Sequence, residues 1–169
     1  MSIAEINNTD HNTVKDQFSK CCGSSVWQEK MLENMPFKNE EEIFSCSEKI
    51  WLQQCKEKDW LEAFTHHPKI GDLKSLEKKF ANTKGWASNE RAGVNNANQK
   101  ILQELSNLND LYENKFGYIF IVCATGKSAD EMLQILKSRI NNTVEQEIKI
   151  AMQEQNKITK IRLEKLLKG

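Results

Sequence analysis

Apolar residues recur at every third or fourth position along most of this sequence, and few residues interrupt the pattern. The 169 residues include only two prolines and seven glycines, the residue types that most often end helices. A spacing of three to four residues places apolar side chains on one face of an α-helix, whereas a half-buried strand would alternate. We therefore predict an all-α protein, built as a single-domain helical bundle that comprises residues 1–169.

Chain-breaking and capping residues divide this pattern into separate helices. Helices are expected to end at Gly23, Pro36, Pro68 and Gly117. A capping box of Ser128 and Glu131 begins a helix that runs to about Ile140, and Asn142 or Thr143 caps a final long helix. The residues before position 10 give only weak signals.

One short run differs in kind from the helical pattern. Residues 118–124, Tyr-Ile-Phe-Ile-Val-Cys-Ala, are wholly apolar, contain several β-branched side chains and lie between Gly117 and Gly126. Such a run is extended or fully buried rather than amphipathic. Because the sequence has no second run of this type to pair with it, we predict one extended segment among the helices rather than a sheet.

Charge, hydropathy and cysteine content indicate which partners and which compartment to expect. Lys and Arg together number 24, as do Asp and Glu, so no overall attraction to nucleic acid or anionic lipid is expected. No apolar run is long enough to span a membrane, and the polar N-terminus is not a signal peptide. The five cysteines form no CxxC pair, which favours reduced thiols. We expect a cytoplasmic protein that binds neither nucleic acid nor membrane.

Two of the three histidines, His66 and His67, stand where one helical pattern stops before Pro68. An imidazole there titrates near neutral pH and can exchange protons with a ligand. The alternative is a helix C-cap, in which the imidazole hydrogen-bonds the last carbonyl groups. A metal site formed by these histidines and Asp72 is disfavoured, because adjacent histidines seldom face one ion and no HExxH motif is present. We expect no metal.

Further polar residues could join a site around His67. Glu90, expected in the first turn of a long helix, would form a general acid–base pair with His67 if both reach one ligand. The favourable helix dipole explains a first-turn glutamate equally well. Backbone amides of Phe120–Ala124 can donate to a developing oxyanion. Gln155 and Arg162 lie in the apolar stripe of the final helix, where a guanidinium either extends to solvent or faces an anion.

Several ordered motifs resemble one known family. The run His67-Pro68-Lys69-Ile70-Gly71-Asp72 resembles the HP[RK]IGD motif of the 2-oxo-4-hydroxy-4-carboxy-5-ureidoimidazoline (OHCU) decarboxylases of urate breakdown. Residues 86–94, Trp-Ala-Ser-Asn-Glu-Arg-Ala-Gly-Val, are similar to their W-S-x-x-E-Q-A-G segment, and residues 116–128 to their FGxxFIxxAxGKS run. With shorter matches elsewhere, the resemblance covers most of the chain.

The resemblance implies an all-helical homodimer that uses no cofactor and acts on a small ureidoimidazoline substrate. It implies that His67 donates a proton, that Glu90 is its carboxylate partner, and that the extended segment lies near the active site. The implied substrate-binding residues are Pro68, Ala87, Ser88, Arg91, Phe120, Ile121, Val122, Cys123, Ala124 and Arg162. The implied reaction converts OHCU to (S)-allantoin and carbon dioxide, and a C=N bond of the substrate itself serves as the electron sink.

Two positions depart from the family pattern. Ala87 stands where the family has serine, and Arg91 follows Glu90 where the family has glutamine. These departures keep two alternatives open. One is a decarboxylase of a related ureido acid, and the other is a non-catalytic helical module that serves binding or dimerisation.

Overall fold

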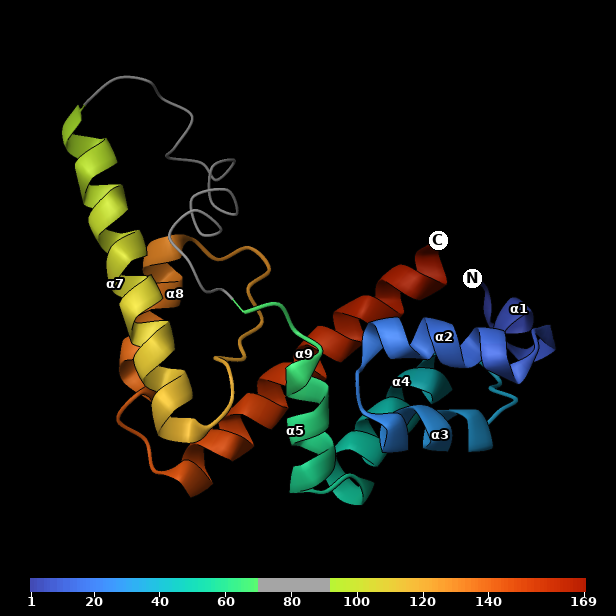
Figure 1. Cartoon of the computed structure of the whole chain (residues 1–169). Coiled ribbons are helices and arrows are strands. Elements are labelled where there is room, and N and C mark those ends of the chain that lie inside the picture. The colour runs from blue at the N-terminus through green and yellow to red at the C-terminus, as the bar shows by residue number, and fades with distance from the viewer. Residues whose placement is uncertain (70–91) are drawn as a thin grey trace. The chain divides into compact units, whose positions relative to one another are not determined.

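The structure, a computed structural model, describes residues 1–69 and 92–169 (Figure 1). Every regular element within these ranges is helical, which confirms the predicted all-α class. The chain divides into two compact units. The first comprises Met1–His67, Ile121–Cys123 and Ile150–Gly169, and the second comprises Pro68–Phe120 and Ala124–Lys149. The single domain expected for residues 1–169 stays a prediction.

The first unit consists of short helices and the greater part of one long helix. Its elements are α1 (Ile3–Asn8), α2 (His11–Cys21), α3 (Ser25–Glu33), α4 (Glu40–Lys49), the π-helix η1 (Ile50–Gln54), α5 (Glu57–Thr65) and, from Ile150 onward, α9 (Val144–Lys168). Ser24 caps α3 by accepting a hydrogen bond from the Trp27 N–H. A capping box of Ser2 and Glu5 begins α1, a helix for which the sequence gives little signal.

Aromatic side chains fill the core of the first unit. Phe18, Trp27, Trp51 and Phe64 are each at most 1% exposed. Burial of an apolar side chain of this kind contributes about 1.5–3 kcal/mol to stability. The indole Nε1 of Trp51 also donates a hydrogen bond to the Met152 carbonyl over 2.7 Å. This bond fixes α9 to the π-helix that directly precedes α5, the helix that leads to His67.

The second unit contains α7 (Ala92–Phe116), α8 (Ala129–Arg139) and the first turns of α9, with α7 packed along α8 (Figure 1). Helix α7 ends at Gly117, whose φ of 80° lies in the left-handed region that favours glycine. Ser128 forms the predicted capping box with Glu131, and Thr143 accepts from the Gln146 N–H at the start of α9. These three predicted helix ends are confirmed.

A buried ion pair organises the second unit. Arg139 and Glu147 are 5% and 0% exposed, and Arg139 Nε donates to Glu147 Oε1 over 2.7 Å. The Tyr112 hydroxyl donates to the same oxygen, and the guanidinium lies 4.7 Å from the centre of the Phe120 ring. Burial and the bond to Glu147 raise the pKa of Tyr112 far above its ordinary value. Removing one member of such a buried pair typically costs about 3–5 kcal/mol.

The apolar run that connects α7 to α8 has no regular structure from residue 119 to residue 124. Phe120, Ile121, Val122 and Cys123 are all buried. Within residues 1–69 and 92–169 no strand pairs with this segment. The prediction of a buried, non-helical segment without a sheet is therefore confirmed.

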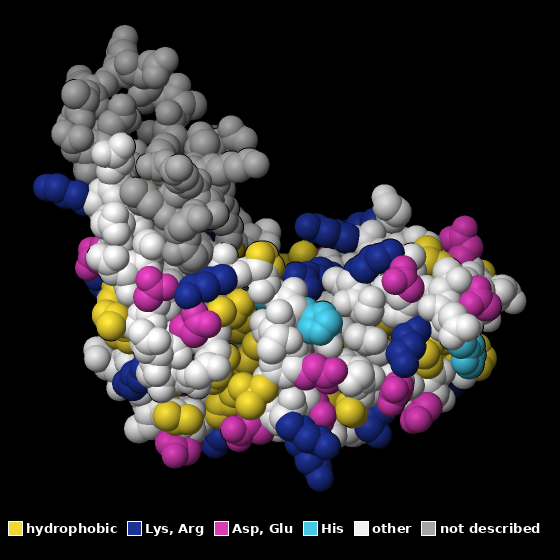
Figure 2. All heavy atoms as spheres, viewed as in Figure 1, with side chains coloured by type: hydrophobic (Ala, Val, Ile, Leu, Met, Phe, Trp, Pro, Cys, Tyr) yellow, Lys and Arg dark blue, Asp and Glu magenta, His cyan; other side chains and the backbone are white. Residues whose placement is uncertain are grey.

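The surface carries charges of both signs. On the face that Figure 2 shows, Lys and Arg side chains lie among Asp and Glu side chains. Of the helices in the described part of the chain, none is sufficiently long and apolar to cross a membrane. The expectation that the protein binds no nucleic acid stays a prediction.

Candidate active site

His67 follows the last turn of α5, and the helix end fixes its backbone. The His66 N–H donates to the Ala63 carbonyl, and the His67 N–H donates to the Phe64 carbonyl over 3.3 Å. The backbone N–H groups of these two residues thus bind the last carbonyl groups of α5. The C-cap interpretation gives that role to an imidazole. His66 is exposed, whereas His67 is half-buried. The two adjacent histidines therefore have different surroundings.

The imidazole of His67 is hydrogen-bonded to α9 of the same unit. Its Nε2 contacts Gln155 Oε1, and Gln155 Nε2 donates to Thr159 Oγ1 over 3.1 Å. Gln155 and Thr159 are 0% and 2% exposed. Buried polar side chains of this kind are costly unless hydrogen-bonded, so the pair forms a fixed support for the ring.

The surroundings of His67 favour its neutral form. Burial lowers the pKa of the imidazole below its ordinary value, the bond to Gln155 opposes this shift, and the charges of Arg162 and His66 add to it. At neutral pH His67 is therefore mainly uncharged. It can become charged briefly when it takes up a proton, as a group that exchanges protons requires.

Arg162 lies two turns along α9 from Gln155 and is half-buried. Its Nη1 donates to the Cys21 carbonyl over 3.4 Å. Its positive charge contributes to the lowered pKa of His67. Among residues 1–69 and 92–169, no carboxylate forms an ion pair with this guanidinium. A cation held in this way beside a proton-exchanging group suits an anionic ligand.

The buried segment Ile121–Cys123 also contacts α9. The Cys123 N–H donates to Glu154 Oε2 over 2.8 Å, and Lys157 Nζ lies 2.5 Å from the other oxygen of that carboxylate. Glu154 directly precedes Gln155, so two consecutive residues of α9 contact the apolar segment and His67. This helix brings together parts of the first unit that are far apart in the sequence.

The remaining predicted site residues divide into two groups. Pro68, Phe120 and Ala124 belong to the second unit, where they are exposed, buried and half-buried. Lys69 of the same motif pairs with Asp110 at 3.0 Å and with Glu113 at 2.5 Å. The predicted residues Ala87, Ser88, Glu90 and Arg91 lie outside the described residues.

Sequence reasoning missed Glu154, and it placed Gln155 in the apolar stripe of the final helix without giving it a role at the site. Gln155 carries a signal that could have found it, because it is a polar residue in the middle of an otherwise apolar helical stripe. Glu154 lies beside that stripe among many charged residues and carries no such signal.

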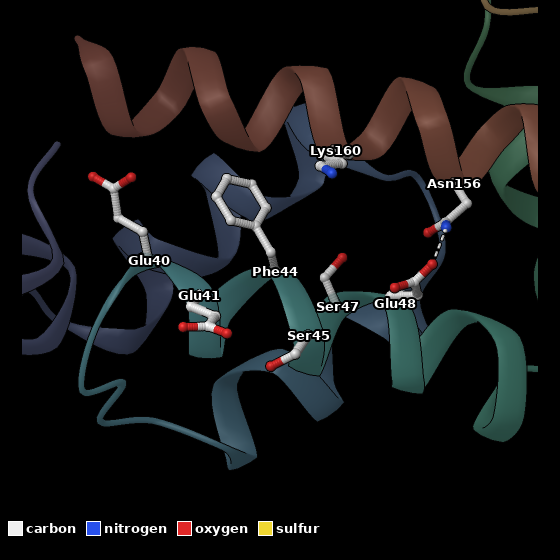
Figure 3. Close-up of a pocket in the computed structure, with 8 residues that line it drawn as sticks. All are labelled: Glu40, Glu41, Phe44, Ser45, Ser47, Glu48, Asn156 and Lys160. Atoms are coloured by element: carbon white, nitrogen blue, oxygen red, sulfur yellow. Dashed lines mark hydrogen bonds between the residues drawn. The ribbon is translucent and has the colours of Figure 1, made fainter.

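A groove of about 510 Å³ lies elsewhere in the first unit, between α4 and α9 (Figure 3). Its lining includes Glu40, Phe44, Glu48 and Lys160, and Glu48 accepts a hydrogen bond from Asn156 over 3.3 Å. None of the predicted site residues lines it. The described residues also contain no group of three histidine, cysteine or acidic side chains placed to hold a metal ion.

Known protein families and solved structures identify the same family as the sequence motifs. The family model described as OHCU decarboxylase matches residues 7–164. The chain belongs to the OHCU decarboxylase family. A solved OHCU decarboxylase, crystallised in the presence of (S)-allantoin, is 38% identical with a TM-score of 0.74, over 91% of this chain and 99% of that chain. This confirms the family resemblance that the motifs indicate.

Other members of the OHCU decarboxylase family differ in length. The uric acid degradation bifunctional protein TTL of Arabidopsis thaliana is 40% identical over 152 residues, which are 90% of this chain and 47% of that protein. This chain thus spans about half the length of that relative. An OHCU decarboxylase of Haloferax volcanii is 23% identical over 96% of this chain and 94% of its own length. An (S)-allantoin synthase structure, 16% identical with a TM-score of 0.68, supports the fold alone.

Proposed function

We propose that this chain is a cofactor-independent carboxy-lyase that converts OHCU to (S)-allantoin and carbon dioxide in urate breakdown. The observation that carries the proposal is the environment of His67. Its ring is half-buried, neutral at neutral pH, held by a buried amide and close to the charge of Arg162. Membership of the OHCU decarboxylase family supports the choice of substrate.

The proposed chemistry needs only side chains, the substrate and protons from solvent. The bond between the ring carbon and its carboxylate breaks, the electron pair moves towards the adjacent C=N bond, and that nitrogen takes one proton from solvent. Glu90 accepts the proton of the substrate hydroxyl, which becomes a carbonyl group. His67 takes up a proton from solvent and delivers it to the ureido-bearing carbon from one face. Protonation from a single face gives (S)-allantoin rather than a racemate.

The other proposed contacts bind the substrate. Arg162 is proposed to attract its carboxylate, since this guanidinium forms no ion pair within the described ranges. Backbone groups of Phe120–Ala124 are proposed to bind the ring. Pro68, Ala87, Ser88 and Arg91 complete the proposed lining. We also propose a cytoplasmic homodimer that uses neither metal nor cofactor, an assembly that rests on the family resemblance.

Stereochemistry provides the test. Urate is converted to the unstable intermediate with the two upstream enzymes, this protein is added, and the optical activity of the allantoin is followed. We expect faster decay and an excess of (S)-allantoin, because spontaneous decay gives a racemate. Racemic product at the uncatalysed rate, from protein whose helical circular dichroism is intact, would overturn the proposal.

Ala87 and Arg91 favour a second candidate, a decarboxylase of a related ureido acid. At position 87 a methyl group stands where the serine of the motif has a hydroxyl. At position 91 a cation stands where the glutamine of the motif has a neutral amide. A preference for a more anionic ureido acid over OHCU, measured as the ratio of kcat/KM values, would favour this candidate.

A further inference from the structure

Gln155 is held at both ends of its side-chain amide. Its Oε1 contacts His67 Nε2, and its Nε2 donates to Thr159 Oγ1 over 3.1 Å. The residue is 0% exposed, so water does not compete for these positions. An amide oxygen only accepts hydrogen bonds and an amide nitrogen only donates them. The orientation of this amide therefore decides which hydrogen the imidazole carries.

Thr159 binds the end of the amide that lies away from His67. Gln155 Nε2 donates to Thr159 Oγ1, so the nitrogen end of the amide faces Thr159. The amide oxygen is then left facing the imidazole, where it accepts from an N–H group.

We propose that Gln155 is a positioning residue that holds neutral His67 as the Nε2–H tautomer and leaves Nδ1 to carry the transferable proton. This inference rests on the proposed function of His67 as a proton donor. The neutral ring first takes up a proton from solvent at Nδ1. In the transfer, this Nδ1–H bond of the imidazolium breaks, its electron pair stays on Nδ1, and the proton bonds to the ureido-bearing carbon. The product is the Nε2–H tautomer, which already matches Gln155 Oε1, so the ring need not rotate.

An amide suits this task better than a carboxylate would. A carboxylate at the same place would stabilise the imidazolium and raise the pKa of His67, which would hold back the proton. The neutral amide fixes the ring and its tautomer while adding no negative charge. This accords with a His67 pKa that stays below the ordinary value in spite of the bond to Gln155.

The tautomer is measured directly by NMR of the imidazole nitrogens, with isotope-labelled histidine, above neutral pH. The chain has only three histidines, so His11→Gln and His66→Gln assign the His67 signals. We expect the Nε2–H form in the wild type and a mixture of both tautomers in Gln155→Leu. Gln153→Leu, at an exposed position of α9, should leave the tautomer unchanged. An Nδ1–H form in the wild type, or an unchanged tautomer in Gln155→Leu, would overturn the proposal.

Three further variants keep the inference testable if Gln155→Leu does not fold. Gln155→Glu keeps the shape and should raise the pKa of His67 by about one unit or more in the same NMR titration. Thr159→Val removes the acceptor that orients the amide and should weaken the tautomer preference, whereas Thr159→Ser should keep it. An unshifted His67 in Gln155→Glu would contradict the inference.

Activity is measured separately from the tautomer. The protein could fail to accelerate the decay of OHCU, although NMR shows the Nε2–H tautomer of His67 and a change of that tautomer in Gln155→Leu. In that case the proposed function fails and the tautomer assignment stands. If the protein is active, Gln155→Leu should lower kcat by about 10-fold to 100-fold with little change in KM, as expected for loss of aligned acid–base catalysis. An active Gln155→Leu variant with wild-type kcat would remove the positioning role.

Discussion

The backbone N–H of Cys123 donates a hydrogen bond to the Glu154 carboxylate over 2.8 Å, and Lys157 pairs with the second oxygen of that carboxylate. This amide belongs to the segment whose backbone is proposed to bind the substrate ring. Its hydrogen is directed to a side chain of α9. The bond therefore supports the shape of the segment and does not leave this N–H group open to a ligand.

Glu154 is predicted to stabilise the segment through this bond. Glu154→Ala should lower the free energy of unfolding by about 1–2 kcal/mol, because a buried N–H group loses its charged acceptor. Glu154→Gln retains an oxygen acceptor and should recover most of the loss. Chemical denaturation of the three proteins measures the effect. Equal stability of Glu154→Ala and the wild type would mean that the bond contributes nothing.

The two adjacent histidines are predicted to differ in function. His67→Ala should reduce stereospecific decay of OHCU by about two to four orders of magnitude, as expected for loss of a general acid. His66→Ala should retain most of the activity, because that side chain is exposed and only the His67 ring contacts Gln155. Initial rates of formation of (S)-allantoin provide the comparison. Similar losses in the two variants would remove the special status of His67.

The lowered pKa of His67 makes a prediction about stability and pH. Below an ordinary histidine pKa of about 6.5, the unfolded chain binds more protons at this position than the folded chain. The contribution of His67 to stability is therefore complete above that value and is lost as pH falls towards the lower folded pKa. Chemical denaturation over this range should show a larger loss on acidification for the wild type than for His67→Gln. A larger loss in His67→Gln would mean that the folded pKa is raised.

Gly23 is predicted to tolerate no larger side chain. A Cβ atom at this position would lie 2.6 Å from His66 Cβ and 2.7 Å from His66 Cδ2. Overpacking of this kind typically costs about 1–3 kcal/mol, and Gly23→Ala should lose stability by that amount. In a His66→Gly background the same substitution should cost much less. A double-mutant cycle measured by thermal unfolding tests this coupling. Additive effects would show that the two positions do not interact.

Arg91 is predicted to contribute a charged contact at the rim of the proposed site. Arginine only donates hydrogen bonds and is always charged, whereas the glutamine of the family motif both donates and accepts. Arg91→Gln should raise KM or change kcat by several-fold. Steady-state kinetics with freshly generated OHCU measures both constants. If neither constant changes, Arg91 does not contact the substrate.

Local signals predicted the helix ends, because their causes lie within a few residues. Ser128 and Thr143 cap their helices as expected, and Gly117 ends α7 in the left-handed conformation that the absence of a Cβ atom permits. The helix α1 escaped prediction although a capping box of Ser2 and Glu5 begins it, because its 6 residues are too few to show a clear apolar period. Val144, an apolar residue in the first turn of α9, is 50% exposed.

The candidate site was predictable only in part. The His67-Pro68 motif identifies its proton-exchanging residue, and the polar interruption of an apolar stripe points to Arg162. The partner of His67 is 88 positions away in the sequence, so no local pattern pairs it with Gln155. The bond from Cys123 to Glu154 depends equally on tertiary packing. The roles of Ala87, Ser88, Glu90 and Arg91 stay predictions, since these residues lie outside the described ranges.

The consecutive positions of Glu154 and Gln155 constrain how this protein can evolve. Each residue added to an α-helix advances it by about 1.5 Å and turns it by about 100°. A one-residue insertion or deletion in α9 shortly before Glu154 would shift both contacts at once and bring neither residue to its partner. Substitutions at Glu154 or Gln155 can change the contact to the apolar segment and the contact to the imidazole one at a time. A change in the length of this helix changes both contacts together. We expect natural length variation in such chains to occur in their loops and at their ends rather than within α9.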